Sequence, residues 1–111
     1  MNNIETLKEV KTQEELEKFF KEYYNRVITA YYDAEDRVNA TNISLIHTDS
    51  EEDVEEREIY EDELTDYEGE VDYYDELRCK LEDYKNNELR NDKMSLATKI
   101  NILLFIVEHD I

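Results

Sequence analysis

The feature that most constrains the fold of this chain is its near lack of chain-breaking residues. Its 111 residues contain no proline and a single glycine, Gly69. Sandwiches and barrels need frequent turns, and glycine and proline provide many of the backbone angles that turns require. The sequence therefore predicts an all-α fold: a small helical bundle with one or two long helices. The length suits a single domain, 1–111.

Apolar residues recur at helical spacing through the first part of the chain. Near the N-terminal end, apolar residues spaced three apart predict a short amphipathic helix that begins near Asn3. Thr12 and Glu15 form a capping-box pattern, which predicts the start of a second helix. We expect this helix to end near Asn39, because residues 40–42 are typical of a loop. Its apolar positions are Leu16, Phe19, Phe20, Tyr23, Val27, Ala30, Tyr31, Ala34 and Val38.

The second half of the chain predicts one long helix, or two helices broken at Gly69. Asp49 or Ser50 would cap its start, and we expect it to end around Arg90. A final helix follows over Ser95–His109. The apolar positions of the long helix, nearly heptad-spaced, are Tyr60, Leu64, Tyr67, Val71, Tyr74, Leu77, Leu81 and Tyr84.

Two short apolar segments leave an alternative open. Residues 43–47 fit a short strand or an extended segment, and residues 100–107 are rich in β-branched side chains. Paired together they would form a two-stranded element and make the fold α+β. As a helix, the last segment is apolar nearly all round. It would then be a buried central helix, or would form a homodimer through Ile100–Val107.

Acidic residues are concentrated in one segment, 49–76. These 28 residues hold sixteen Asp or Glu and one basic residue, Arg57, and so carry −15 of the formal charge of −18. If helical, the segment is about 42 Å long at ~1.5 Å per residue, with one carboxylate per roughly 2.6 Å. Duplex DNA carries one charge per ~1.7 Å counting both strands and one per ~3.4 Å along each strand. The carboxylate density lies between these values.

Such a segment is costly to hold on a folded element, which favours a functional role. Ordinary exposed helices mix in Lys and Arg, whereas like charges one turn apart repel each other. Tyr73 lies among the acids and is the best candidate for an exposed ring, on which an arginine of a partner could stack. The predicted partner-binding residues are Asp49, Glu51, Glu52, Asp53, Glu55, Glu56, Glu58, Glu61, Asp62, Glu63, Asp66, Glu68, Glu70, Asp72, Tyr73, Asp75 and Glu76.

No pattern typical of catalysis is visible. One glycine cannot form a glycine-rich phosphate loop. His47 and His109 are far apart and stand in no Glu-x-x-His or His-x-x-x-His pattern, and Cys79 has no legible catalytic partner. In a segment this acidic, paired carboxylates occur at almost any spacing. We therefore expect no enzymatic activity, no cofactor and no metal site.

In size, charge and helix-rich pattern the chain resembles the small acidic phage proteins that act as DNA mimics against restriction, CRISPR or repair enzymes. That resemblance implies an inhibitor that blocks the basic groove of a DNA- or RNA-binding protein or nuclease complex. An antitoxin or immunity protein against a basic toxin is one alternative. A helical dimeric adaptor with a merely solvating acidic face is another.

The surroundings of the protein are also predicted from the sequence. A chain this acidic repels nucleic acid and anionic membranes, so we expect neither as a direct partner. The longest apolar run, Ile102 to Val107, is shorter than the ~18 residues of a membrane span. The first ten residues lack a signal-peptide pattern, which predicts a cytoplasmic location, in a bacterial host cell.

Overall fold

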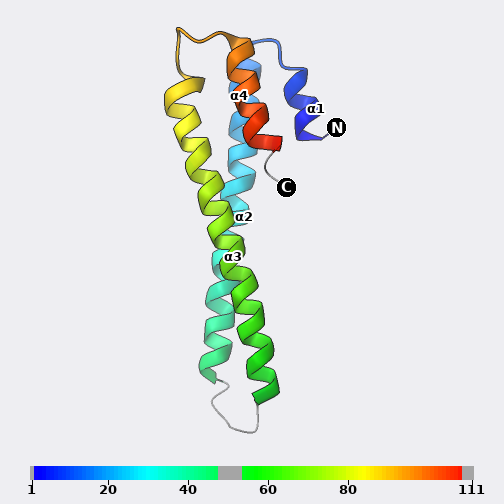
Figure 1. Ribbon diagram of the computed structural model, residues 1–111, viewed down its shortest axis with the longest axis vertical. Helices are drawn as coiled ribbons and strands as arrows, with labels where there is room; N and C mark the ends of the chain where they lie inside the picture. The colour runs from blue at the N-terminus through cyan, green and yellow to red at the C-terminus, as the bar shows by residue number, and fades with distance from the viewer. Residues whose placement is uncertain (1, 48–53, 109–111) are drawn as a thin grey trace. The chain divides into compact units, whose positions relative to one another are not determined.

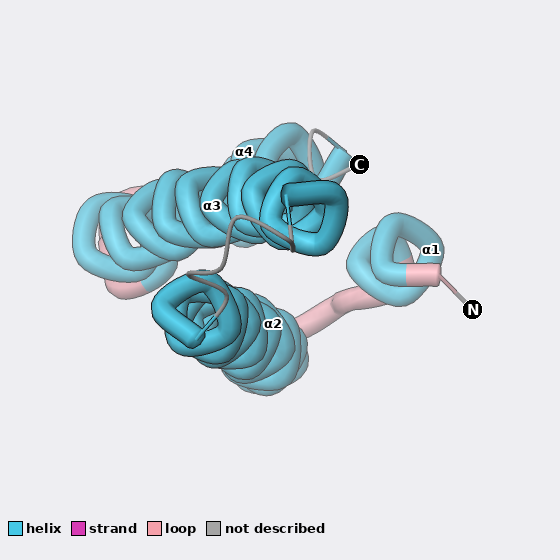
Figure 2. The backbone as a smooth tube through the Cα atoms, turned by 90° about the horizontal axis from the view of Figure 1, so that it is seen from below, coloured by secondary structure: helices cyan, strands magenta, loops and turns pink. Residues whose placement is uncertain are grey.

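The computed structural model describes residues 2–47 and 54–108, of which 45–47 and 54–57 by their backbone alone. The described residues form four α-helices and one π-helical turn, without a strand (Figures 1 and 2). The all-α prediction is confirmed. The α+β alternative is wrong, because both of its segments are helical. The elements are α1 (Asn3–Lys8), α2 (Gln13–His47), α3 (Val54–Tyr84), the π turn η2 (Lys85–Leu89) and α4 (Leu96–Glu108).

Helix α2 begins at the cap that the sequence indicates, and α4 begins just after Ser95, where the sequence predicts the start of the final helix. Glu15 N donates to Thr12 Oγ1 at 3.1 Å, and Glu15 Oε2 accepts from Lys11 N at 3.0 Å. The first bond satisfies a donor that the first turn of α2 leaves unpaired, and the second ties the residue before Thr12 to that turn. At α4, Thr98 N donates to Ser95 Oγ at 3.2 Å. The expected cap at Asp49 or Ser50 lies outside the described residues.

The predicted end of α2 near Asn39 is wrong, since the helix continues to His47. Residues 40–42 include no glycine or proline, and Thr and Asn disfavour a helix by less than ~1 kcal/mol each. Thr41 is only 7% exposed and lies three residues beyond Val38, so it continues the inward stripe. A polar residue in an apolar position hid this continuation. The same extension makes residues 43–47 helical.

Helix α3 passes through Gly69 without a break. A Cβ at this position would meet nothing within 4 Å, and the backbone has no positive φ there. The helix leads directly into η2, whose C-cap is Arg90. The expected end around Arg90 is therefore correct, but the π turn was not predicted.

The chain divides into two compact units. The core unit combines Met1–Val27 with Leu77–Ile111, and the hairpin unit is Ile28–Glu76. Of the thirteen buried apolar residues described, twelve belong to the core unit and only Ala34 to the hairpin unit. The core unit therefore has a hydrophobic core in the usual sense. The single-domain expectation is not tested by this division and stays a prediction.

Polar contacts join four elements inside the core unit. Lys99 Nζ donates to Gln13 Oε1 at 3.1 Å, and Gln13 Nε2 donates to the Leu89 carbonyl at 2.9 Å. The buried hydroxyl of Tyr84 donates to the Lys99 carbonyl at 2.9 Å. Its burial, and secondarily the charge of Glu88, raises the pKa of Tyr84 above its ordinary value. The start of α2, the end of α3, η2 and α4 are thus linked.

Candidate protein-docking surface

The charge of the chain is divided very unevenly between the two units. The hairpin unit contains nineteen Asp or Glu against two Arg, a formal charge of −17. The core unit contains twelve acids and eleven bases, a formal charge of −1. Three acids of α2, namely Asp33, Glu35 and Asp36, belong to the hairpin unit and add to the charge of the predicted segment. They lie outside the acidic run 49–76, and only the packing of α2 with α3 in the hairpin unit brings them into the same charged unit.

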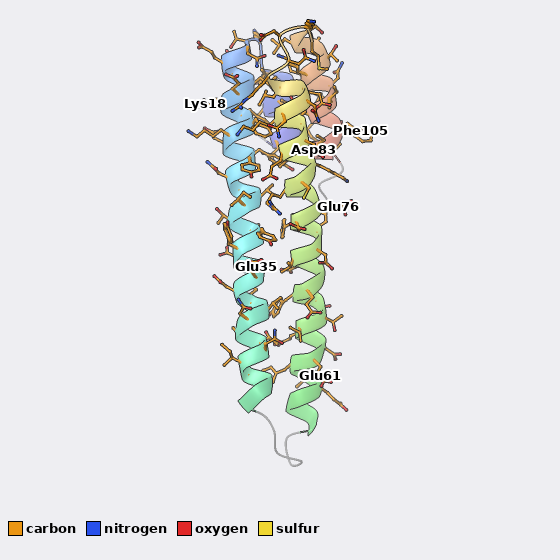
Figure 3. All side chains as sticks on the ribbon, turned by 90° about the vertical axis from the view of Figure 1, so that its left-hand side faces the viewer. Lys18, Glu35, Glu61, Glu76, Asp83 and Phe105 are labelled. Atoms are coloured by element: carbon orange, nitrogen blue, oxygen red, sulfur yellow. The ribbon has the colours of Figure 1, made fainter. Side chains whose placement is uncertain are left out.

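Helix α3 presents most of its described acidic side chains to solvent. Ten acids lie from Glu58 to Glu76; Glu70 and Asp75 are half-buried and the other eight are exposed. Glu61 and Glu76 are labelled on α3 in Figure 3. The exposed acids are Glu58, Glu61, Asp62, Glu63, Asp66, Glu68, Asp72 and Glu76.

The apolar stripe of α3 explains why these acids point outward. Leu64, Tyr67, Val71 and Tyr74 are half-buried, and they follow one another at steps of three and four residues. Residues between them fall on the flanks and on the outer side of the helix. In the hairpin unit, this stripe of α3 lies beside the C-terminal part of α2 (Figure 1). The helix therefore holds the acids in fixed directions.

One basic side chain neutralises part of this surface. Arg37 Nη1 lies 2.9 Å from Glu70 Oε2, and its guanidinium is 5.9 Å from the ring centroid of Tyr67. Among the side chains described in the hairpin unit, Arg37 is the only Lys or Arg. Glu70 lies on one flank of the α3 stripe. Among the described side chains of α3, the opposite flank, which includes Glu68 and Asp72, has no basic residue.

A shallow groove lies on that opposite flank. It has a volume of about 400 Å³, and its walls include Glu35 from α2 and Glu68 and Asp72 from α3. Val38 and Val71 provide apolar surface beside these carboxylates. An arginine or lysine of a partner could lay its methylene stem on the valines and extend its charge to the carboxylates. The groove joins two helices that are distant in sequence, so it could not be predicted from spacing.

Tyr73 is 38% exposed, and its ring centroid lies 5.2 Å from that of Tyr74 in an edge-to-face arrangement. Tyr67 and Tyr74 are half-buried, as expected of residues on the apolar stripe. Tyr73 is therefore more exposed among the acids than Tyr67 and Tyr74, which lie on the apolar stripe.

Six of the predicted partner-binding residues have no described side chain. Asp49, Glu51, Glu52 and Asp53 lie outside the described residues, and for Glu55 and Glu56 only the backbone is described. In the described parts of the chain, no group of three or more His, Cys, Asp or Glu is arranged to hold a metal ion. No described helix is both long enough and apolar enough to cross a membrane.

Comparison with known proteins gave no match: no family model, curated protein or solved structure is significantly similar to this chain.

Proposed function

We propose that the chain is a non-catalytic inhibitor whose hairpin unit occupies the basic groove of a DNA- or RNA-binding protein. The observation that carries this proposal is the division of charge, −17 in the hairpin unit and −1 in the core unit. Charge that served only solubility would not need to be confined to one unit. Restriction and CRISPR nuclease complexes are the kind of partner that fits, which would make the chain a phage anti-defence protein.

The described part of α3 has a charge density comparable to that of nucleic acid. Ten carboxylates from Glu58 to Glu76 span about 27 Å at ~1.5 Å per residue, or one per roughly 2.7 Å. The two values for duplex DNA, ~1.7 Å for both strands and ~3.4 Å along one strand, bracket this spacing. A groove whose lysines and arginines are spaced to meet phosphates therefore meets carboxylates at a similar density.

The cost of this surface supports a functional reason for it. Several acids of α3 lie four residues apart, and each such pair destabilises a helix by ~0.2–0.5 kcal/mol at low salt. The pairs are Glu58–Asp62, Asp62–Asp66, Asp66–Glu70, Glu68–Asp72 and Asp72–Glu76. Because the stripe holds the helix despite this repulsion, the carboxylates are already in place before a partner arrives. Binding then loses little conformational entropy.

The test is capture of partners from a bacterial lysate at low and high salt, followed by competition with duplex DNA on the purified pair. We expect the captured proteins to bind nucleic acid, to be released by high salt and to be displaced by DNA. Replacing Glu58, Asp62, Glu68 and Asp72 with Lys should abolish capture.

A matched variant carries the same change of charge in the core unit. Glu9, Glu22, Asp83 and Glu108 are exposed there, and their replacement with Lys should leave capture intact. Equal loss in both variants would mean that net charge alone matters. Capture that survives the α3 reversals, or a partner that DNA does not displace, would contradict the proposal.

An antitoxin or immunity protein would use the same acidic complementarity against a basic toxin. The identity of the captured protein separates the two cases. A toxin encoded beside this chain would favour the antitoxin, and a restriction or CRISPR component of a host would favour the anti-defence protein.

A second candidate function is self-association through α4. Lys99 and Glu108 are the only charged residues among its thirteen, and Lys99 is buried, so the outward face is uncharged up to Glu108. Phe105 is 63% exposed on that face and points away from the helix (Figure 3). A second copy is the occupant that fits, because two such faces match each other and the core unit carries only −1.

Phe105→Glu tests this second candidate better than a change at Leu104 would. Leu104 is half-buried, so Leu104→Glu would also disturb the core unit, whereas Phe105 is mostly exposed. We expect sedimentation to show a dimer for the native chain and a monomer for Phe105→Glu. A native chain that stays monomeric at high concentration would rule out the dimer.

A further inference from the structure

A cavity in the core unit has the opposite electrostatic character from the acidic groove. Its volume is about 490 Å³, which lies in the range of small-molecule sites, ~300–1,000 Å³. Three basic residues line it: Lys21 from α2, Lys85 from η2, and Arg90 at the end of η2. Glu17 is the only acid among its lining residues, so the lining sums to +2. In a chain with 31 acids and 13 bases, this is an unusual concentration of positive charge.

The three cations have no ion pair with any described residue. Arg37 and Arg78, by contrast, each lie within 4.0 Å of a glutamate. Gln13 Nε2 donates a hydrogen bond to Glu17 Oε1 at 3.4 Å. Among the described residues, Glu17 forms no ion pair with Lys21, although Lys21 lies one helical turn away. Charges that stabilised the fold alone would be expected to pair with some of the many nearby acids. Three basic side chains that share one cavity, and stay unpaired, point to an anionic ligand.

The π turn brings part of this lining together. In an α-helix, Leu89 would lie one turn beyond Lys85, and Arg90 would point further round the helix. The wider i→i+5 turn of η2 brings Arg90 back toward the side of Lys85. Lys85, Leu89 and Arg90 accordingly all line the cavity. Single π turns often occur at functional sites, because they cost hydrogen-bond quality while redirecting side chains.

The rest of the lining suits a flat, partly apolar body. Phe20 and Leu89 are each 4% exposed and form an apolar surface at the bottom of the cavity. The ring of Tyr24 stacks near that of Phe20, with centroids 5.8 Å apart and planes 13° apart. The Tyr24 hydroxyl donates to Glu82 Oε1 at 2.7 Å, which fixes the ring. Asn25 adds an amide to the wall.

We propose that this cavity binds a small phosphate ester of the mononucleotide class. Lys85 and Arg90 hold the phosphate, and Lys21 adds a third positive charge. The flat nucleobase of the ligand lies against the apolar and aromatic wall. A phosphate monoester carries −1.5 to −2 near pH 7, which matches the local charge, and arginine binds phosphate oxygens in a bidentate manner. The site lies in the core unit and does not depend on the proposed inhibitor function.

Calorimetric titration with adenosine 5′-monophosphate tests the site, with adenosine and inorganic phosphate as separate probes. We expect the monophosphate to bind, and the two fragments to bind at least about tenfold more weakly, because each lacks half of the contacts. The double variant Lys85→Gln with Arg90→Gln should weaken binding by about tenfold or more, since two charge-assisted bonds are lost.

A matched double variant, Lys11→Gln with Lys93→Gln, removes the same charge from exposed positions outside the cavity and should bind as the native chain does. Circular dichroism of each variant establishes that it is folded, and the single change Lys21→Gln repeats the test if the double variant is not. Absence of binding by the native chain at millimolar monophosphate would overturn the proposal. So would equal binding of monophosphate, adenosine and inorganic phosphate, or equal weakening in the two double variants.

Discussion

The core unit and the hairpin unit use the same two long helices for different purposes. In α3, the stripe is buried at Leu77, Leu81 and Tyr84, all in the core unit, whereas Leu64 and Val71 in the hairpin unit are only half-buried. Charge shows the reverse, with −1 in the core unit and −17 in the hairpin unit. One part of each helix therefore contributes to a hydrophobic core, and the other part mainly presents charge.

The difference follows from how many elements each unit packs together. In the hairpin unit, two helices cover one stripe on each other, and every other face meets solvent. In the core unit, α1, η2 and α4 join the remaining parts of α2 and α3, so apolar side chains are covered from several sides. Full burial of an aliphatic or aromatic side chain stabilises by ~1.5–3 kcal/mol, and half-burial by correspondingly less. The core unit should therefore hold most of the stability of the chain.

The sharpest test of that comparison is to remove a leucine from each unit. Leu103→Ala in α4 truncates a side chain that is 0% exposed, and we expect a loss of about 2–5 kcal/mol in the free energy of unfolding. Leu64→Ala in α3 truncates a half-buried side chain, and we expect about 1 kcal/mol. Urea titration followed by circular dichroism measures both. Equal losses would show that the hairpin unit contributes as much stability as the core unit.

A smaller effect, confined to the core unit, is expected from Tyr84→Phe. The change removes the hydrogen bond from the Tyr84 hydroxyl to the Lys99 carbonyl, which should cost about 0.5–1.5 kcal/mol at neutral pH. Burial raises the pKa of Tyr84 in the folded chain. Its contribution is then fully present below the unfolded pKa of about 10 and is lost as the pH rises through the folded pKa.

The pH dependence gives this prediction its control. Above about pH 10 the native chain should lose stability faster than Tyr84→Phe, because the unfolded native chain gains the ionised Tyr84. The other tyrosines are common to both proteins and cancel in the difference. Parallel curves of unfolding free energy from pH 8 to 11 would contradict the assigned burial effect.

The helices were predictable from the sequence because their signals are local. The cap at Thr12 and the steps of three and four along α2 and α3 depend only on neighbouring residues. Where a polar residue occupied an inward position, the signal failed, as at Thr41 in α2. The reason is that burial of such a side chain depends on the facing helix, which periodicity does not describe.

The candidate surface was predictable only in part, for the same reason. The acids of α3 stand out in the sequence as a charge run. The groove beside Glu35 and the pair between Arg37 and Glu70 depend on which residues of α2 face α3. The π turn at Lys85–Leu89 was also missed. An extra residue in one turn is decided by packing around it and leaves no pattern of its own.

The smallest expected effect, and the only stabilising one, is Gly69→Ala in the hairpin unit. Glycine in a helix interior costs roughly 0.5–1 kcal/mol relative to alanine, because the unfolded glycine has more conformational freedom. At Gly69 an added Cβ meets nothing within 4 Å and the backbone is already helical, so no strain offsets the gain. Hydrogen exchange should show slower opening of α3 around residue 69, with amides of α4 unchanged. Slower exchange both around residue 69 and in α4 would mean that the two units open together rather than separately. Faster exchange at residue 69 would mean that the continuous helix needs glycine there.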